Sequence, residues 1–396
     1  MRKILLTALL TAVLLAQVAL MYNYVVPRQH YIFDFAQRWL GARAMLLERR
    51  NPYSQEVTDE IQMALVGRPL GEDRCQQGFL YPPFLAFTVP HFLLPYRLGL
   101  STWIVTLQVL LVSSLWLIVR CTSGVGKIGT AHLLLLTLAA VTFRYSLLNL
   151  GYAQFSILVL FWAALTWWLW DRGRFLLAGM VLALVASKPQ LALLLIPVWL
   201  VLAMAQRRWR FIIGFGIAMG LLLALPFLFL GNWIPDLVNA LVNAMQTCQT
   251  PVYEGPSFWY RLLIFLILTG GLLVLTVLSP QRWQGRRLGY LLSLTVATTM
   301  LGTPFTHSYD LVFALFPLLY GLVMVRGQPG RGARLLEFAF WATLVVLPWL
   351  LWALAPNHQP DPLERWFFPT VVLALLAGLG AVDMHKGGAA HLPNQD

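Results

Sequence analysis

The chain has 396 residues, of which 59% are hydrophobic and only 11% charged, with a mean hydropathy of +0.70. An average soluble domain is about 45–50% apolar and about 25% charged, so this composition excludes an ordinary soluble protein and predicts an integral membrane protein. The formal net charge is +12, but the positive residues are scattered over many short segments instead of one patch. The charge therefore gives no support to nucleic-acid binding.

Apolar runs of roughly 20 residues recur along the chain, as expected for membrane-spanning α-helices, and they are continuous where the strands of a β-barrel would alternate. In chain order, the runs cover residues 4–25, 101–119, 128–142, 147–170, 175–187, 190–205, 211–230, 259–278, 288–302, 309–325, 335–355 and 367–382. No linker rich in Pro or Ser separates a soluble domain. Residues 1–396 are therefore predicted to form a single all-α polytopic membrane domain.

Short basic connections between these runs predict the orientation, because Lys and Arg in short loops stay on the cytoplasmic side. They are Arg2-Lys3, Arg120 with Lys127, Arg172 with Arg174, Arg207 with Arg208 and Arg210, Arg282 with Arg286 and Arg287, Arg326 with Arg331 and Arg334, and Lys386. If all of these connections are cytoplasmic, residues 79–119 must begin on the outer side of the bilayer and end on the cytoplasmic side, so they contain only one span. We therefore interpret the run 83–96, which prolines interrupt, as a re-entrant or surface helix on the outer side. A full span there would turn every later basic loop outward.

This topology has about twelve spans, with both termini inside, a long first outer loop at 26–80 and a cytoplasmic tail at 383–396. Residues 1–25 could also be a cleaved signal peptide with a charged start. No convincing small-x-small cleavage site precedes Tyr22-Asn23-Tyr24, which favours an uncleaved first helix. Cys75 and Cys248 fall outside in this topology and could pair, whereas Cys121 falls inside. The sequence has no CxxC motif or His/Cys cluster, so we expect no metal and no cofactor.

Polar residues at membrane depth are costly to bury and are usually functional, and in this topology most of them fall at the outer end of the helices. They are Asp34, Arg38, Tyr81, Arg144, Asn149, Gln154, Lys188, Gln190, His307 and Asp310. Acidic, basic and amide groups that reach one end from separate loops indicate a single site more than a set of helix caps.

Asp34 lies where the chain leaves the first helix, between Phe33 and Phe35. It could cap a juxtamembrane helix, but a charge in such apolar surroundings favours a functional role. Arg38 lies four residues further on, at the spacing that allows contact on one helix face. It could therefore be an ion-pair partner of Asp34 or a ligand contact.

Lys188 could extend its ammonium group to the surface along its own aliphatic stem. Pro189, however, breaks the helix beside it and leaves backbone groups near the lysine, an arrangement suited to a phosphate. Arg144 admits the same two interpretations. His307, three residues before Asp310, is explained as well by a structural role as by a ligand. Trp39 could stack on a sugar.

Five stretches, in this order, resemble the polyprenol-phosphate-mannose-dependent α-mannosyltransferases of the GT-C superfamily, and the resemblance covers roughly residues 1–330. They are DFAQRWLGARAMLLERRNPYS, YPPFLAF with LLP, GYAQFSIL, SKPQLALLLIPVWL followed by QRRWR, and TPFTHSYDLVFALFPLL.

The resemblance implies a GT-C-type helical bundle whose long first outer loop carries an acidic catalytic base near its start, the place that Asp34 occupies here. Lys188 matches the family's Lys-Pro pair, and His307 lies where the family carries a polar residue that faces the site. The Gly-Gln pair usual in the family is Ala153-Gln154 here, and Arg50 stands where a glycine often precedes Asn-Pro-Tyr. The implied activity is transfer of a hexose, mannose in that family, from a polyprenyl-phosphate donor to a lipid or glycan acceptor. It would take place at the periplasmic or exterior face of the inner (plasma) membrane, among membrane lipids.

In this chemistry Asp34 would take the proton of an acceptor hydroxyl as that oxygen attacks the anomeric carbon with inversion. The aromatic neighbours Tyr31, Phe33 and Phe35 are expected to raise the pKa of Asp34 and strengthen it as a base. The leaving lipid phosphate needs positive charge, for which the candidates are Lys188, Arg144 and His307. The candidates for binding the sugar or the acceptor are Arg38, Trp39, Tyr81, Gln154, Gln190 and Asp310.

A transporter or flippase of lipid-linked sugars is the alternative. Transporters often contain two related halves with interrupted helices at the membrane midplane. This sequence shows no internal repeat, and its polar residues gather toward one surface. A purely structural or scaffolding membrane protein would leave that gathering unexplained, so the sequence favours the transferase.

Overall fold

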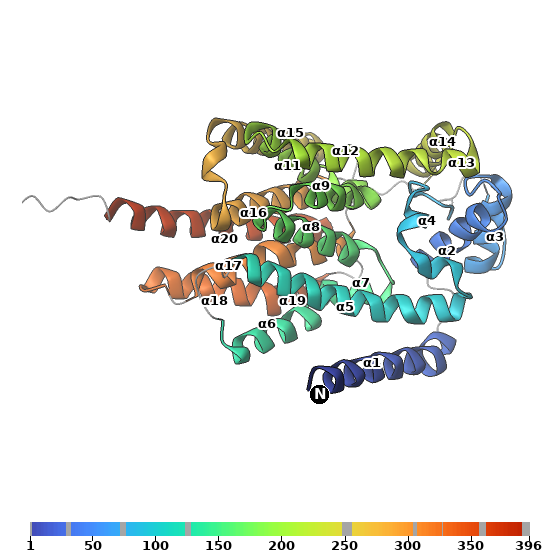
Figure 1. The fold of residues 1–396 in the computed structure, drawn as a ribbon, viewed down its shortest axis with the longest axis horizontal. Coiled ribbons are helices and arrows are strands. Elements are labelled where there is room, and N and C mark those ends of the chain that lie inside the picture. The colour runs from blue at the N-terminus through green and yellow to red at the C-terminus, as the bar shows by residue number, and fades with distance from the viewer. Residues whose placement is uncertain are drawn as a thin grey trace, which may run out of the picture. The chain divides into compact units, whose positions relative to one another are not determined.

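A computed structural model describes residues 2–28, 33–71, 77–122, 128–247, 256–303, 307–326, 328–355 and 362–389, and every regular element in these ranges is helical (Figure 1). The chain divides into two compact units. The first unit holds residues 1–110, 150–155 and 219–251, and the second holds residues 111–149, 156–218 and 252–396.

The first unit consists mainly of helices from the N-terminal part of the chain. They are α1 (Arg2–Leu20), the π-helix η1 (Met21–Val25), η2 (Val26–Arg28), α2 (Phe33–Leu46), α3 (Gln55–Val66), α4 (Leu85–Thr88), η3 (Pro90–Leu93), α13 (Phe227–Leu230) and α14 (Ile234–Thr247). Three helices belong in part to each unit, namely α5 (Tyr96–Thr122), α7 (Arg144–Gly151) and α12 (Trp209–Ala224).

The second unit holds the remaining helices. They are α6 (Thr130–Thr142), α8 (Ser156–Asp171), α9 (Phe175–Leu184), η4 (Val185–Ser187), α10 (Pro189–Ala192), α11 (Leu195–Ala205), α15 (Pro256–Leu278), η6 (Pro280–Arg282), α16 (Gly285–Gly302), η7 (Ser308–Ala314), α17 (Leu315–Val325), α18 (Arg331–Val345), α19 (Leu347–Leu354) and α20 (Pro362–Ala389).

Five helical stretches of the described residues are long and apolar enough to cross a membrane, as the composition predicts for a polytopic protein. They are Thr7–Arg28, Tyr96–Thr122, Trp209–Leu230, Ser308–Val325 and Glu364–Ala381. Two bent pairs raise the number to seven if each pair is one span: α6 with α7, bent by 54°, and α18 with α19, bent by 49°. Shorter apolar helices occupy several other predicted spans, including α8 and α11. The total of twelve spans stays a prediction.

The proline-interrupted run 83–96 forms α4 and η3, which have four residues each. A four-residue helix is only about 6 Å long, whereas a span needs about 30 Å. This run therefore contains no spanning helix, in agreement with its interpretation as a short, non-spanning segment. Its assignment to the outer side stays a prediction.

The predicted loop 26–80 contains two well-formed helices, α2 and α3, which pack against each other (Figure 1). Ser54 caps the start of α3, where its hydroxyl accepts a hydrogen bond from the Val57 amide, and Gly67 caps the end of the helix in the left-handed conformation. Val57 and Ile61 of α3 pack with Ala44 of α2 and with Phe79. The loop thus carries its own small hydrophobic core.

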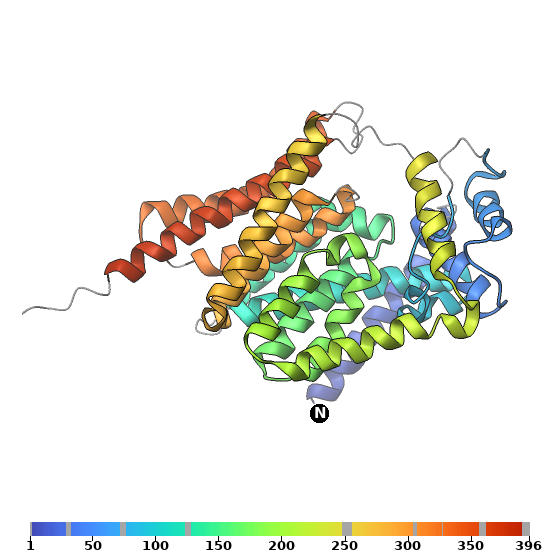
Figure 2. The ribbon, with the colours of Figure 1, turned by 90° about the horizontal axis from the view of Figure 1, so that it is seen from above.

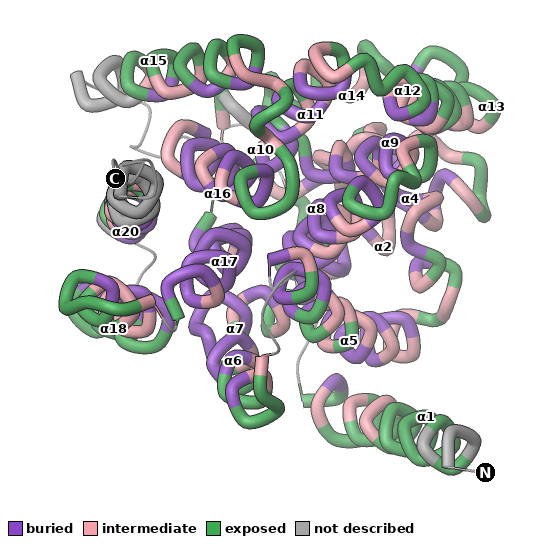
Figure 3. The backbone as a smooth tube through the Cα atoms, turned by 60° about the vertical axis from the view of Figure 1, so that its left-hand side comes forward, coloured by how far each residue is buried: buried purple, intermediate pink, exposed green. Residues whose placement is uncertain are grey.

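The second unit is built around α16 and α17. The α16 helix packs along α15, α17 and α20 (Figure 2). The α17 helix is buried along most of its length, in contrast to the largely exposed α1 of the first unit (Figure 3). Close backbone contact also occurs between α9 and α12, where a Cβ atom on Gly179 would lie 2.0 Å from the Phe211 carbonyl oxygen.

Several sequence predictions fall on residues outside the described ranges. Cys75 and Cys248 are among them, so their pairing is untested, while Cys121, in the last turn of α5, is a free thiol. Tyr31 and the side chain of Phe33 are not described either, and Phe35 packs against Phe92 and Tyr96. The expected cytoplasmic tail begins within α20, which continues to Ala389.

Ala153 has a positive φ of 50°, a conformation that costs L-residues about 1–2 kcal/mol. The family resemblance places a glycine at this position. We expect Ala153→Gly to raise the free energy of unfolding by up to about 1 kcal/mol, since glycine relieves the strain but gains entropy in the unfolded chain. Ala153→Val should lower it by about 2 kcal/mol or more, because the site is fully buried. Thermal unfolding of the detergent-solubilised chain measures the stability of both variants. A Val variant more stable than wild type would show that the backbone at Ala153 is not strained.

Arg50, next to the Asn51-Pro52-Tyr53 turn, holds Glu60 of α3 through two hydrogen bonds of 2.7 and 2.9 Å, and also contacts Glu48. The Arg50 guanidinium lowers the pKa of Glu60 below its ordinary value of 4.5. The resulting stabilisation is present above that value and is lost as the pH falls through the lowered pKa.

We therefore expect Arg50→Gln to lower the unfolding temperature slightly at neutral pH, because Glu60 is largely exposed and the pair is screened by solvent. The difference between variant and wild type should shrink between about pH 6 and about pH 3. Differential scanning fluorimetry over this range measures it. A difference that grows on acidification would show that Arg50 stabilises the chain in another way.

Candidate functional site

The first polar cluster lies in the first unit and surrounds Arg38 of α2, whose side chain is fully buried. Its guanidinium donates hydrogen bonds to the Asp34 carbonyl at 2.7 Å, to Gln154 Oε1 at 2.9 Å and to the Tyr81 hydroxyl. It also stacks on the rings of Tyr81 and Phe155, with its Cζ 4.2 and 4.6 Å from their centroids. The cluster thus joins α2 to two segments that follow far along the chain, and it contains Arg38, Tyr81 and Gln154, three of the predicted sugar- or acceptor-binding residues.

Asp34 lies in the first turn of α2, next to this buried cation. Its Oδ1 is 3.8 Å from Arg38 Nη2, and its side chain is 22% exposed. Arg38 is therefore an ion-pair partner of Asp34 at the predicted four-residue spacing, while solvent or a ligand can still reach the carboxylate. A partly exposed carboxylate on a helix turn that its neighbour fixes can accept a proton from a bound hydroxyl group, which is the role of a general base.

The ring of Trp39 is held in place by three contacts. Its indole N–H donates to the Leu94 carbonyl at 2.9 Å, Tyr96 meets the ring edge-on, and the Arg43 guanidinium lies 4.8 Å from its centroid. A sugar could meet only the part of the ring that these contacts leave accessible. Its stacking role stays a prediction.

The Asn51-Pro52-Tyr53 turn is hydrogen-bonded to the backbone of the same cluster. The Tyr53 hydroxyl donates to the Tyr81 carbonyl at 2.6 Å, and Asn51 Nδ2 donates to Asp236 of α14 at 2.7 Å. Asn51 also accepts from the Tyr53 amide. These bonds fix the backbone that carries Tyr81, one of the partners of Arg38.

The second polar cluster lies in the second unit and joins Lys188, Asp310 and Ser156, all of them buried. Lys188 Nζ donates to Asp310 Oδ1 and, at 2.8 Å, to Ser156 Oγ, and Ser156 in turn donates to Asp310 Oδ1 at 2.6 Å. Lys188 Nζ also lies 4.8 Å from the centroid of Tyr309. A buried ammonium and a buried carboxylate are tolerated together because each neutralises the other.

Helix ends create this second cluster. Lys188 has a non-helical backbone between η4 and α10, and Pro189 is the first residue of α10, so the break predicted at Lys-Pro is present. Asp310 lies in η7, where its Oδ2 accepts from the His307 amide at 3.1 Å. His307 itself is exposed and lies beside the ring of Tyr309. Gln190 lies in α10 and is partly exposed.

Arg144 begins α7 at the bend that follows α6, and it forms a separate buried ion pair with Glu364 at the start of α20, at 2.8 Å. Glu364 Oε2 is buried and has no hydrogen-bond partner in the described parts of the chain. Asn149, later in α7, donates to the Tyr309 carbonyl at 3.3 Å. Arg144 is thus neutralised by a carboxylate that the sequence did not single out.

The structure brings the predicted residues together in groups, each within its own unit. Asp34, Arg38, Tyr81 and Gln154 form one group, and Lys188 and Asp310 another, while Arg144 pairs with Glu364. The convergence of all of them in one site stays a prediction. Ser156 and Glu364 were missed. Ser156 stands in the apolar run 147–170, where a polar side chain is a signal, whereas Glu364 precedes the run 367–382.

The described residues contain no cluster of side chains that could bind a metal ion. Within those residues, no three His, Cys, Asp or Glu side chains lie close enough to hold an ion. The expectation that the chemistry needs no metal stays a prediction.

Comparison with known proteins gives one match. A family model described as "Glycosyltransferase family 87" matches residues 79–304, which is more than half of the chain. No curated protein and no solved structure matches. The matched range includes Tyr81, Gln154 and Lys188, and it begins after Asp34.

The buried Lys188–Asp310 pair allows a test of charge compensation. Asp310→Asn keeps the side-chain volume but leaves the Lys188 ammonium uncompensated, so we expect the free energy of unfolding to fall by about 3–5 kcal/mol. The double variant Lys188→Met/Asp310→Leu removes both charges and should recover most of this loss. Denaturant unfolding of the solubilised full chain measures both, and equal losses in the two variants would contradict a compensated pair.

Proposed function

The chain belongs to glycosyltransferase family 87, and from this premise we propose that it transfers a hexose from a polyprenyl-phosphate donor to a lipid or glycan acceptor. Mannose is the proposed sugar, on the strength of the resemblance to polyprenol-phosphate-mannose-dependent enzymes of the GT-C superfamily. The proposed location is the plasma membrane, with the reaction at its extracytoplasmic face, since the basic loops favour a cytoplasmic position for the opposite ends of the helices.

The proposed mechanism rests on the exposure of the Asp34 carboxylate and on its fixed position in α2. Its carboxylate is partly exposed, and the fully buried Arg38 holds the turn of α2 that presents it. An exposed carboxylate is available to a hydroxyl group, and a fixed neighbour limits the orientations that the carboxylate adopts. We therefore assign the general base to Asp34 and a positioning role to Arg38.

The reaction is a single displacement at the anomeric carbon. The acceptor hydroxyl oxygen forms the new bond to this carbon, and its proton passes to the Asp34 carboxylate. The bond between the anomeric carbon and the phosphate oxygen breaks, and the electron pair leaves with the polyprenyl phosphate. Attack opposite to the leaving group inverts the configuration, so a β-linked donor gives an α-linked product.

The departing phosphate gains negative charge, which nearby cations would stabilise. We propose Lys188, Arg144 and His307 for this role. Lys188 and Arg144 each face a carboxylate in the structure, so a phosphate would have to share or replace Asp310 or Glu364 as their partner. Lys188 and Arg144 both lie at helix breaks inside the matched range, whereas His307 lies just after it. Lys188 has the further support of the Lys-Pro pair in the family resemblance.

The remaining predicted residues would contact the sugar or the acceptor. Tyr81 and Gln154 both accept hydrogen bonds from the Arg38 guanidinium, so a ligand that bonds to either of them would also lie close to this positive charge. Trp39 would offer part of its ring to the sugar. The proposed sugar- or acceptor-binding set is Arg38, Trp39, Tyr81, Gln154, Gln190 and Asp310.

The test is substitution of the proposed base. Asp34→Asn keeps the shape of the side chain but removes its basicity, so we expect transfer to fall by at least about 100-fold while expression and donor binding stay near wild type. Incorporation of radiolabelled sugar from polyprenyl-phosphate-mannose into product, in vesicles that contain the full chain, measures transfer.

Asp59→Asn serves as the matched control, since it removes one carboxylate from α3 in the same loop. It should leave the rate unchanged. Near-normal turnover by Asp34→Asn would exclude Asp34 as the base, and donor that only changes leaflet without forming product would favour the transporter instead.

A further inference from the structure

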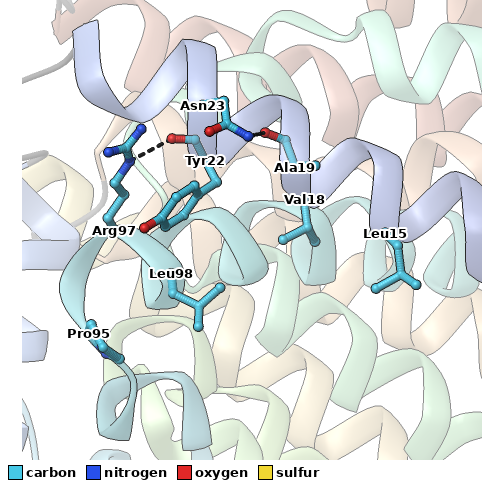
Figure 4. Close-up of a pocket in the computed structure, with 8 residues that line it drawn as sticks. All are labelled: Leu15, Val18, Ala19, Tyr22, Asn23, Pro95, Arg97 and Leu98. Atoms are coloured by element: carbon cyan, nitrogen blue, oxygen red, sulfur yellow. Dashed lines mark hydrogen bonds between the residues drawn. The ribbon is translucent and has the colours of Figure 1, made fainter.

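A groove of about 370 Å³ lies in the first unit between α1, with the following η1, and the start of α5 (Figure 4). Leu15, Val18, Ala19 and Tyr22 line it from one helix face, because residues three and four apart point to the same side. The opposite wall includes Arg97 and Leu98, and the lining is completed by Asn23 and Pro95. None of these residues belongs to the polar clusters described above.

The chemistry of the groove changes along its length. Leu15, Val18 and Leu98 form an apolar floor, whereas Arg97 stands at the Tyr22 end (Figure 4). Arg97 Nε donates to the Tyr22 carbonyl at 2.6 Å, and its Cζ lies 4.2 Å from the Tyr22 ring centroid. The remaining N–H groups of this guanidinium bond to nothing else in the described residues, so they are available to an anion.

One wall of the groove belongs to an exposed, apolar helix, as a lipid-binding site requires. The stretch Thr7–Arg28 is long and apolar enough to span a membrane, yet only 6% of its most apolar window is buried in the protein. Most of α1 is therefore exposed and apolar, as expected for a helix that faces lipid. Tyr22 stands near the end of this stretch and accepts the Arg97 hydrogen bond there, and aromatic side chains at the ends of spans are enriched at the headgroup level.

We propose that this groove binds an anionic phospholipid of the surrounding bilayer, with its phosphate on Arg97 and an acyl chain against Leu15, Val18 and Leu98. A fork of guanidinium N–H groups matches phosphate oxygens, and a net negative headgroup complements the single cation better than a zwitterionic one. The inference does not depend on the proposed transferase activity.

The experiment measures lipid binding to the full chain in detergent by native mass spectrometry. The probes are dioleoyl phosphatidylglycerol, dioleoyl phosphatidylcholine and a polyprenyl phosphate. Wild type should retain phosphatidylglycerol about tenfold more strongly than phosphatidylcholine, and Arg97→Gln should abolish this preference. Arg68→Gln, which removes an exposed arginine elsewhere in the unit, should keep it.

A second variant guards against loosening of α1 by loss of the Arg97–Tyr22 bond. Val18→Trp keeps Arg97 but fills the apolar floor, and it should weaken phosphatidylglycerol binding about tenfold. Equal binding of the two phospholipids by wild type, or an unchanged preference in Arg97→Gln, would overturn the proposal. So would Arg97-dependent binding of the polyprenyl phosphate without binding of phosphatidylglycerol, since the groove would then belong to the donor.

Discussion

A buried guanidinium imposes the strictest constraint on the first unit. Arg38 is fully shielded from solvent, and an unpaired charge in such surroundings would cost several kcal/mol. It is accommodated by three oxygen acceptors and two aromatic faces, which come from α2, from the segment before α4 and from residues 154 and 155. Each of these segments has to be placed correctly for the others to be satisfied. Asp34 is held in position by this arrangement, because Arg38 bonds to its carbonyl oxygen and lies beside its carboxylate.

Much of the helical architecture could be predicted from hydropathy, because burial in a bilayer requires long, continuous apolar runs. Proline chemistry predicted the short elements at 83–96 and the break at Lys188. The number of spans was harder to predict. The run 147–170, expected as one span, is divided into α7 and α8, and the bend before Arg144 follows from backbone geometry that no periodicity reveals.

The site could be predicted only in part, for a different reason. The pairing of Arg38 with Asp34 is local and follows from a helical turn. The partners of Lys188 and Arg144 are separated from them by 122 and 220 positions, so the fold alone brings them together. The sequence identified Lys188, Arg144 and Asp310 as costly polar residues, but it did not pair Lys188 with Asp310 and it missed Glu364, the partner of Arg144. Glu364 went unnoticed because it stands at the start of the last helix, where an acidic residue is ordinary.

The exposure of α1 has a consequence for how the protein responds to its membrane. With 19 residues at 1.5 Å each, α1 is about 28 Å long, close to the thickness of a bilayer's hydrocarbon core. A helix that touches mainly lipid adjusts its tilt when that thickness changes, at a small energetic cost. The Arg97–Tyr22 bond holds one end of this segment, so a change in tilt displaces Leu15 more than the residues beside Tyr22. Acyl-chain length in the host membrane would then set the width of the gap beside α5.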